Sequence, residues 1–82
     1  MFERITFDPQ IMGGRACIRG MRITVSHVVN MVANGMTTDE IMREYPDLEV
    51  EDIRDALQYA AFLSREEVMP ATGRPVERAV RP

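Results

Sequence analysis

Apolar and polar side chains alternate along the first 25 residues of the chain, as they do in β-strands. Segment 3–7 (ERITF) alternates in this way and predicts a short strand. Segments 15–18 (RACI) and 21–25 (MRITV) lie on either side of Arg19 and Gly20. This arrangement predicts a β-hairpin with a two-residue turn.

Such a hairpin sorts its side chains onto two faces, because every second residue of a strand points the same way. The apolar face would hold Ala16, Ile18, Met21, Ile23 and Val25. The opposite face would hold Arg15, Cys17, Arg19, Arg22 and Thr24. Residues 8–14 (DPQIMGG) carry a proline and two glycines, so we expect a turn there.

Two short helices are predicted after the hairpin, each with start and stop signals. The apolar positions of the first are Val25, Val28, Val29 and Val32. Thr24 can cap this helix and Gly35 can end it. Thr37 and Glu40 have the spacing of a capping box at the start of the second helix, and Pro46 ends it.

A third and longer helix is predicted over roughly 50–67. Its inner stripe is expected to consist of Ile53, Leu57, Ala60 and Ala61, with Ala56 beside it. Segment 56–63 (ALQYAAFL) is apolar on nearly every face, and such helices are buried on two sides. Tyr59 and Phe62 lie away from the main stripe, so we expect them to contact something other than this chain's core.

The helical pattern stops after Met69. Residues 70–82 (PATGRPVERAVRP) contain three prolines and a glycine and show no helical period. We therefore expect a folded domain over 1–69 and a flexible, disordered tail over 70–82.

The composition describes one small domain of 82 residues, whose own core is marginal. Cys17 is the only cysteine and no metal-ligand cluster is visible, so we expect no disulfide and no cofactor. Small domains without disulfides or metal sites often oligomerise, which favours a homodimer or a complex with another partner. No apolar run approaches the roughly 18 residues of a membrane span, and the N-terminus lacks signal-peptide features, so a cytoplasmic location is expected.

The net charge of −3 argues against a protein that simply coats nucleic acid. The charge is unevenly distributed: residues 1–24 carry +2, residues 39–67 carry −7 and residues 70–82 carry +2. Every basic residue is arginine, which suits bidentate recognition of carboxylate or phosphate.

Catalysis is not expected. His27 and Cys17 are each unique, and nothing in the pattern brings them together. The acidic residues lie at helix starts or on solvent faces, where a structural role explains them. Stretch 13–20 (GGRACIRG) lacks the order of a phosphate-binding loop, and a bend and a turn account for its glycines.

DNA binding is a stronger hypothesis, because the second and third helices have helix-turn-helix proportions. The candidate DNA-binding residues are Arg15, Arg19, Arg22, Arg54 and Gln58. However, the third helix begins with Glu51, Asp52 and Asp55, and carboxylates beside phosphates cost affinity. The alternative is that the hairpin arginines pair with acidic helices of this chain or of a second copy.

The tail arginines also have two interpretations. Arg74, Arg78 and Arg81 either belong to a solvated terminus or form a segment that folds on an acidic partner.

Residues 5–60 resemble a small bacterial family, the domain of unknown function four-three-three. The most specific motifs are GGRACIRGMRITV, ANGMTTDEI and EYPDLEVEDIRDAL. The matching motif positions are Arg15, Ile18, Arg19, Gly20, Arg22, Ile23, Pro46, Leu48, Asp52 and Ile53. Two positions depart from the family: Glu49 replaces a common Thr cap, and Met21 replaces a usual Thr.

This resemblance implies an α+β fold that is mainly α. Short N-terminal strands would precede a three-helix, homeodomain-like helix-turn-helix. It further implies a VapB-like antitoxin of a type II toxin–antitoxin system, which inhibits a PIN-like ribonuclease toxin encoded by a neighbouring gene and represses its own operon.

On the antitoxin hypothesis, the expected toxin-binding residues are Tyr59, Phe62, Arg74, Arg78 and Arg81. The alternatives are a stand-alone DNA-binding transcriptional regulator and a purely structural dimerisation domain.

Overall fold

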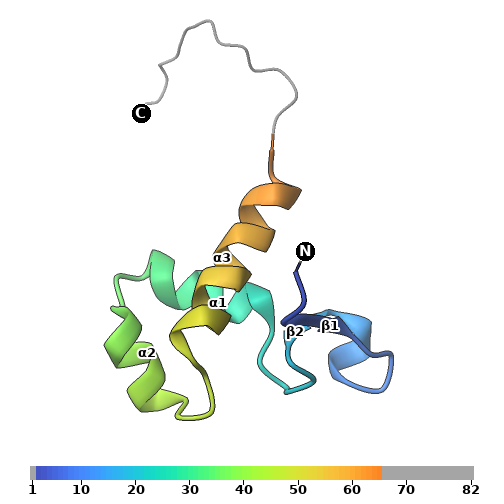
Figure 1. Cartoon of the computed structure of the whole chain (residues 1–82), viewed down its shortest axis with the longest axis horizontal. Helices are drawn as coiled ribbons and strands as arrows, with labels where there is room; N and C mark the ends of the chain where they lie inside the picture. The colour runs from blue at the N-terminus through green and yellow to red at the C-terminus, as the bar shows by residue number, and fades with distance from the viewer. Residues whose placement is uncertain (1, 66–82) are drawn as a thin grey trace, which may run out of the picture.

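Two short strands precede three helices in the computed structural model, which describes residues 2–65 (Figure 1). The elements are strand β1 (Ile5–Phe7), the 3-10 turn η1 (Met12–Gly14), strand β2 (Ala16–Ile18), and helices α1 (Val25–Ala33), α2 (Thr38–Glu44) and α3 (Val50–Leu63). In Figure 1 helices α1 and α3 lie at the centre, with α2 on one side and the strands on the other. The fold class predicted from the sequence is thus confirmed, and the predicted tail lies outside the described residues.

The strands β1 and β2 form an antiparallel pair in which Ile5 faces Ile18 and Phe7 faces Ala16. The predicted strand over 3–7 is therefore confirmed, but the partner of β2 is β1 rather than residues 21–25. The predicted turn does form. Arg19 and Gly20 both have positive φ, and the Met21 N–H donates to the Ile18 carbonyl at 2.7 Å.

Residues 21–25 contribute only one bridge to β2, between Cys17 and Thr24. The predicted hairpin is thus much shorter than expected, with this bridge and a bond from the Ile18 N–H to the Ile23 carbonyl, because Thr24 is already the N-cap of α1 and the chain leaves the sheet there. The predicted separation of faces also fails. Cys17 and Thr24, both expected on the polar face, are buried, and the two residues pair directly with each other.

Local capping sets the helix starts as the sequence predicts. The Thr24 hydroxyl accepts a hydrogen bond from the His27 N–H at 3.1 Å, and Thr37 and Glu40 form the expected capping box. Gly35 follows α1 with φ +91°, a conformation that favours glycine.

Helix α3 ends at Leu63, short of the predicted 67. Of its predicted inner stripe, Ile53 is buried, Leu57 and Ala60 are half-buried against the core, and Ala61 is exposed. Ala56, expected beside the stripe, is buried. The prediction for Ala61 is wrong: neighbouring Ala60 packs against the core, whereas the end of α3 projects beyond the other elements (Figure 1).

The core joins the strands to all three helices. Its buried apolar side chains are Ile5, Ile18, Val25, Val28, Met31, Ile41, Leu48, Ile53 and Ala56. None of the helices in residues 2–65 has the length and apolar character needed to cross a membrane.

Replacing Gly20 with alanine is expected to lower the free energy of unfolding by about 1 kcal/mol, because the residue has φ +73°. No atom lies within 4 Å of the added Cβ, so the loss reflects backbone strain alone. Gly20→Asn should lose less, since asparagine tolerates this conformation. Denaturant unfolding measures both variants, and equal losses for the two would contradict the explanation.

Candidate functional site

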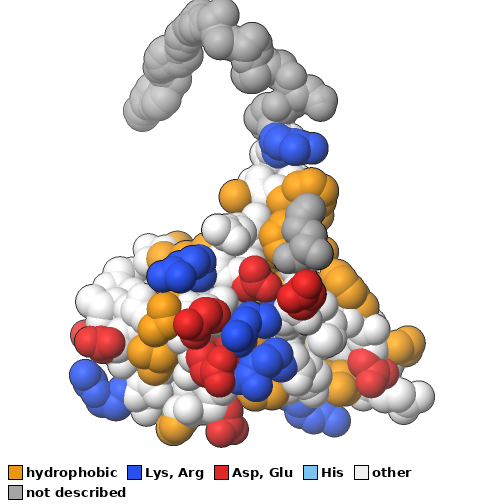
Figure 2. All heavy atoms as spheres, viewed as in Figure 1, with side chains coloured by type: hydrophobic (Ala, Val, Ile, Leu, Met, Phe, Trp, Pro, Cys, Tyr) orange, Lys and Arg blue, Asp and Glu red, His pale blue; other side chains and the backbone are white. Residues whose placement is uncertain are grey.

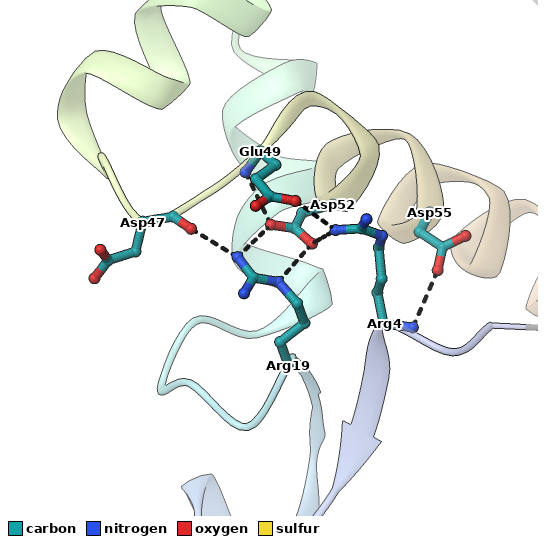
Figure 3. Close-up of polar contacts among 6 residues, drawn as sticks. All are labelled: Arg4, Arg19, Asp47, Glu49, Asp52 and Asp55. Atoms are coloured by element: carbon teal, nitrogen blue, oxygen red, sulfur yellow. Dashed lines mark hydrogen bonds and ion pairs between the residues drawn. The ribbon is translucent and has the colours of Figure 1, made fainter.

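A buried carboxylate in the first turn of α3 holds two arginines from the N-terminal part of the chain (Figure 3). The side chain of Asp52 is 0% exposed. Its Oδ1 accepts hydrogen bonds from Arg4 Nη1 at 2.8 Å and Arg19 Nε at 2.9 Å. Its Oδ2 accepts from Arg19 Nη2 at 2.9 Å and from the Glu49 N–H at 2.8 Å. Both oxygens of this buried charge are therefore satisfied.

Further bonds extend this network to its neighbours. Arg4 Nη1 also donates to Glu49 Oε1 at 2.8 Å, and Arg19 Nη2 donates to the Asp47 carbonyl at 2.7 Å. The network thus connects the start of β1, the turn after β2 and the loop between α2 and α3. Glu49, which lacks the usual Thr hydroxyl, participates through its backbone and its carboxylate.

The ionisation of these groups follows from the geometry. Burial alone would raise the pKa of Asp52, but hydrogen bonds from Arg19, Arg4 and the Glu49 N–H outweigh it and lower that pKa to about 2. The same hydrogen bonds with Asp52 raise the pKa of Arg4 and of Arg19. All three groups are therefore charged at neutral pH.

The network determines what Arg19 can do. Its guanidinium forms a bidentate pair with Asp52, which matches the alternative that hairpin arginines pair with acidic helices of their own chain. Sequence reasoning missed Arg4, because nothing local signals a partner 48 residues away. On the face in Figure 2, basic and acidic side chains are intermingled near the start of α3.

The other candidate DNA-binding residues are exposed: Arg15, Arg22, Arg54 and Gln58. Among residues 2–65, neither Arg22 nor Arg54 has an ion-pair partner. Arg54 and Gln58 lie one turn apart on α3, whereas Arg15 belongs to a different feature, the apolar groove.

The apolar groove is a hollow of about 510 Å³ between the strands, the start of α1 and the end of α3. Its lining consists of Phe7, Arg15, Ala16, Thr24, Val25, Ser26, Val29, Tyr59, Ala60 and Leu63. Phe7 is 58% exposed and Leu63 is 63% exposed. Within the described part of the chain, Arg15 is the one charged residue of this lining.

Aromatic side chains adjoin the groove. Tyr59 is half-buried and makes edge contacts with Phe2 and Phe7, at ring-centroid distances of 5.3 and 6.0 Å. The prediction that Tyr59 avoids the chain's own core is therefore wrong, because the N-terminal strand brings both phenylalanines onto α3. Phe62 is 44% exposed, and its ring lies 5.6 Å from that of Phe2.

The predicted tail residues and the residues considered for catalysis and metal binding are the remaining candidates. Arg74, Arg78 and Arg81 lie outside the described residues. No group of three or more His, Cys, Asp and Glu side chains within residues 2–65 could hold a metal ion. Cys17 is buried, and His27 forms a 2.9 Å hydrogen bond with the Tyr45 hydroxyl.

Asp52→Asn is expected to lower the free energy of unfolding by about 2 kcal/mol, because it leaves two guanidinium groups without their carboxylate. The loss is smaller than for a fully buried ion pair, since the Arg4 and Arg19 side chains are 33% and 38% exposed. Asp47→Asn is the matched control, because only the backbone carbonyl of Asp47 bonds to Arg19. Equal stability of the two variants in denaturant unfolding would contradict this role.

The contribution of Asp52 to the free energy of unfolding should decrease as the pH falls. The pKa of this carboxyl falls from 3.8 to about 2 on folding, so the folded state is stabilised above about pH 4. This contribution is lost as the pH falls from about 4 to about 2. The stability difference between wild type and Asp52→Asn should therefore shrink over that range. A difference that stays constant down to pH 2 would contradict the assignment.

The chain is similar to two proteins that lack an assigned function. It is 38% identical over 58 residues to the uncharacterized protein y4eO of Sinorhizobium fredii, covering 71% of this chain and 26% of that protein. The chain thus spans about a quarter of the length of that relative. A crystal structure of a DUF433 member protein from Anabaena variabilis matches with a TM-score of 0.68 and 34% identity, covering 72% of this chain and 58% of the other.

A family model described as Protein of unknown function (DUF433) matches residues 5–60. The match runs from β1 into the second half of α3 and includes Arg19, Asp52 and most of the groove. It covers the same residues as the resemblance found in the sequence. This chain is a member of the DUF433 family.

Proposed function

We propose that this chain is an antitoxin, a module that binds and inhibits a PIN-like ribonuclease toxin encoded by a neighbouring gene. The observation that carries the proposal is the apolar groove, bordered by the exposed side chains of Phe7 and Leu63. Large contiguous apolar patches on a protein surface mark interaction sites, whereas single exposed apolar side chains do not. Phe62, on the last turn of α3, adds further exposed apolar area.

The distribution of charge favours a protein partner over nucleic acid. Arg4 and Arg19 are paired with Asp52, so they offer little charge for the phosphate contacts that dominate DNA affinity. Glu49 and Glu51 are exposed at the start of α3, where a recognition helix would approach the groove of DNA.

The tail supplies the inhibitory chemistry in this proposal. PIN-like nucleases gather carboxylates around a divalent metal, and Arg74, Arg78 and Arg81 are suited to pair with carboxylates. The groove would then provide most of the affinity, and the tail would block the active site.

DNA binding by the same domain is the second candidate function. Exposed Arg54 and Gln58 on α3, which follows α2 after a short turn, favour it. Such a domain would repress its own operon, or act as a regulator without any toxin. Operator binding that weakens steeply with salt would support this candidate, because phosphate neutralisation releases counterions.

Co-expression with the neighbouring gene's product tests the antitoxin proposal. The full-length chain is expected to copurify with that product and to restore host growth. Leu63→Glu should reduce copurification, because it places a charge in the apolar groove. The chain cut after Met69 should still copurify but restore growth less, since it lacks the tail arginines.

Val50→Glu is the matched control, an exposed apolar residue at the other end of α3 and outside the groove lining. It should copurify as the wild type does. If the wild-type chain neither copurified with the neighbour nor restored growth, the antitoxin proposal would be wrong.

A further inference from the structure

We propose that the apolar groove binds an amphipathic acidic segment of the partner protein, and that Arg15 pairs with a carboxylate of that segment. This inference rests on the proposed function and adds the chemistry of the bound segment. It assigns Arg15, first considered as a DNA contact, to protein recognition.

The groove has the size and lining of a binding site. Its volume of about 510 Å³ lies within the range of about 300–1,000 Å³ that is usual for ligand pockets. Apolar side chains come from four places: Phe7 on β1, Ala16 on β2, Val25 and Val29 on α1, and the end of α3. Such a surface accommodates the apolar face of an amphipathic segment.

Three hydroxyl side chains line the groove, from Thr24, Ser26 and Tyr59, and the first two contact each other at the start of α1. Thr24 is buried and caps α1 through the His27 N–H, and its hydroxyl lies 3.3 Å from that of Ser26. The groove therefore offers apolar contact rather than a polar pocket. Besides the Tyr59 hydroxyl, the charged group of this lining is the guanidinium of Arg15.

The backbone of Arg15 is held by a hydrogen bond, whereas its side chain forms no ion pair within residues 2–65. Its N–H donates to the Met12 carbonyl at 3.3 Å, where it ends the 3-10 turn immediately before β2. In contrast to Arg4 and Arg19, it forms no ion pair within residues 2–65. Arg15 is exposed and lines the groove, so its guanidinium can meet a carboxylate on an incoming segment.

Charge complementarity indicates that the bound segment carries negative charge. The residues lining the groove, all within the described range, include Arg15 but no carboxylate. Beyond them, the guanidinium carbon of Arg65 lies 5.1 Å from the centroid of the Phe62 ring, at the same end of α3. A cationic edge beside an apolar floor favours a partner that carries apolar residues next to Asp or Glu.

The end of α3 from a second copy of this chain is a poorer occupant. If the end of α3 from one copy entered the groove of another, Arg65 would approach Arg15, and like charges would oppose the contact. We assign the bound segment to a different protein, in keeping with the proposed function, and self-association through the acidic helices of a second copy is an outcome that the experiment can reveal.

The test measures binding of the purified full-length chain to the purified product of the neighbouring gene by calorimetry. Arg15→Glu should weaken the complex at least about tenfold, because it turns attraction into repulsion at the edge of the groove. Arg15→Lys should retain most of the affinity, because it keeps the charge. Hydrogen exchange on the partner should show protection of one apolar segment that contains Asp or Glu, and replacing that carboxylate with arginine should restore binding to Arg15→Glu.

Arg43→Glu is the matched control, with the same change of charge on exposed α2 and outside the groove lining. It should bind as the wild type does. A complex that Arg15→Glu leaves as tight as wild type would overturn the inference while leaving the proposed function intact. The inference would also be overturned if a second copy of the chain occupied the groove and the partner could not displace it. Absence of any complex with the wild-type chain would overturn the proposed function and this inference together.

Discussion

The pairing of the buried Asp52 carboxylate with Arg4 and Arg19 is the constraint on which the arrangement of this fold depends. A carboxylate without contact to water is stable only if its charge and both oxygens are satisfied. Asp52 meets that requirement with donors from β1, from the turn after β2 and from its own helix. The two-stranded sheet, too small to be stable alone, is thereby fastened to α3.

Fastening β1 to α3 also creates the surface assigned to function. With β1 in place, Phe2 and Phe7 reach Tyr59, and the strands form one wall of the groove. The same network neutralises two arginines at the start of α3. The described surface therefore separates into a region of internally paired charge and an apolar hollow beside the available Arg15.

This division bears on the DUF433 family, to which the chain belongs through residues 5–60. A similar sequence occupies about a quarter of the longer Sinorhizobium fredii protein y4eO. A domain of this size that presents an apolar groove next to a single cation is suited to hold a partner protein. The proposed antitoxin activity uses the groove for affinity, and the proposed acidic segment explains why Arg15 stays unpaired within residues 2–65.

The sequence by itself determined the helices and the Arg19-Gly20 turn, because capping by Thr24 and Thr37 and positive φ at Gly20 depend on neighbours a few residues away. It also placed Ile53 in the core, and Leu57 and Ala60 against it, through helical spacing. Only the tertiary structure decided the partner of β2, the burial of Cys17 and the inward contacts of Tyr59. It likewise decided that Arg4 and Arg19 meet Asp52, 48 and 33 residues away. Such contacts join segments whose local patterns are compatible with several pairings, and the choice depends on burying one carboxylate together with the apolar core.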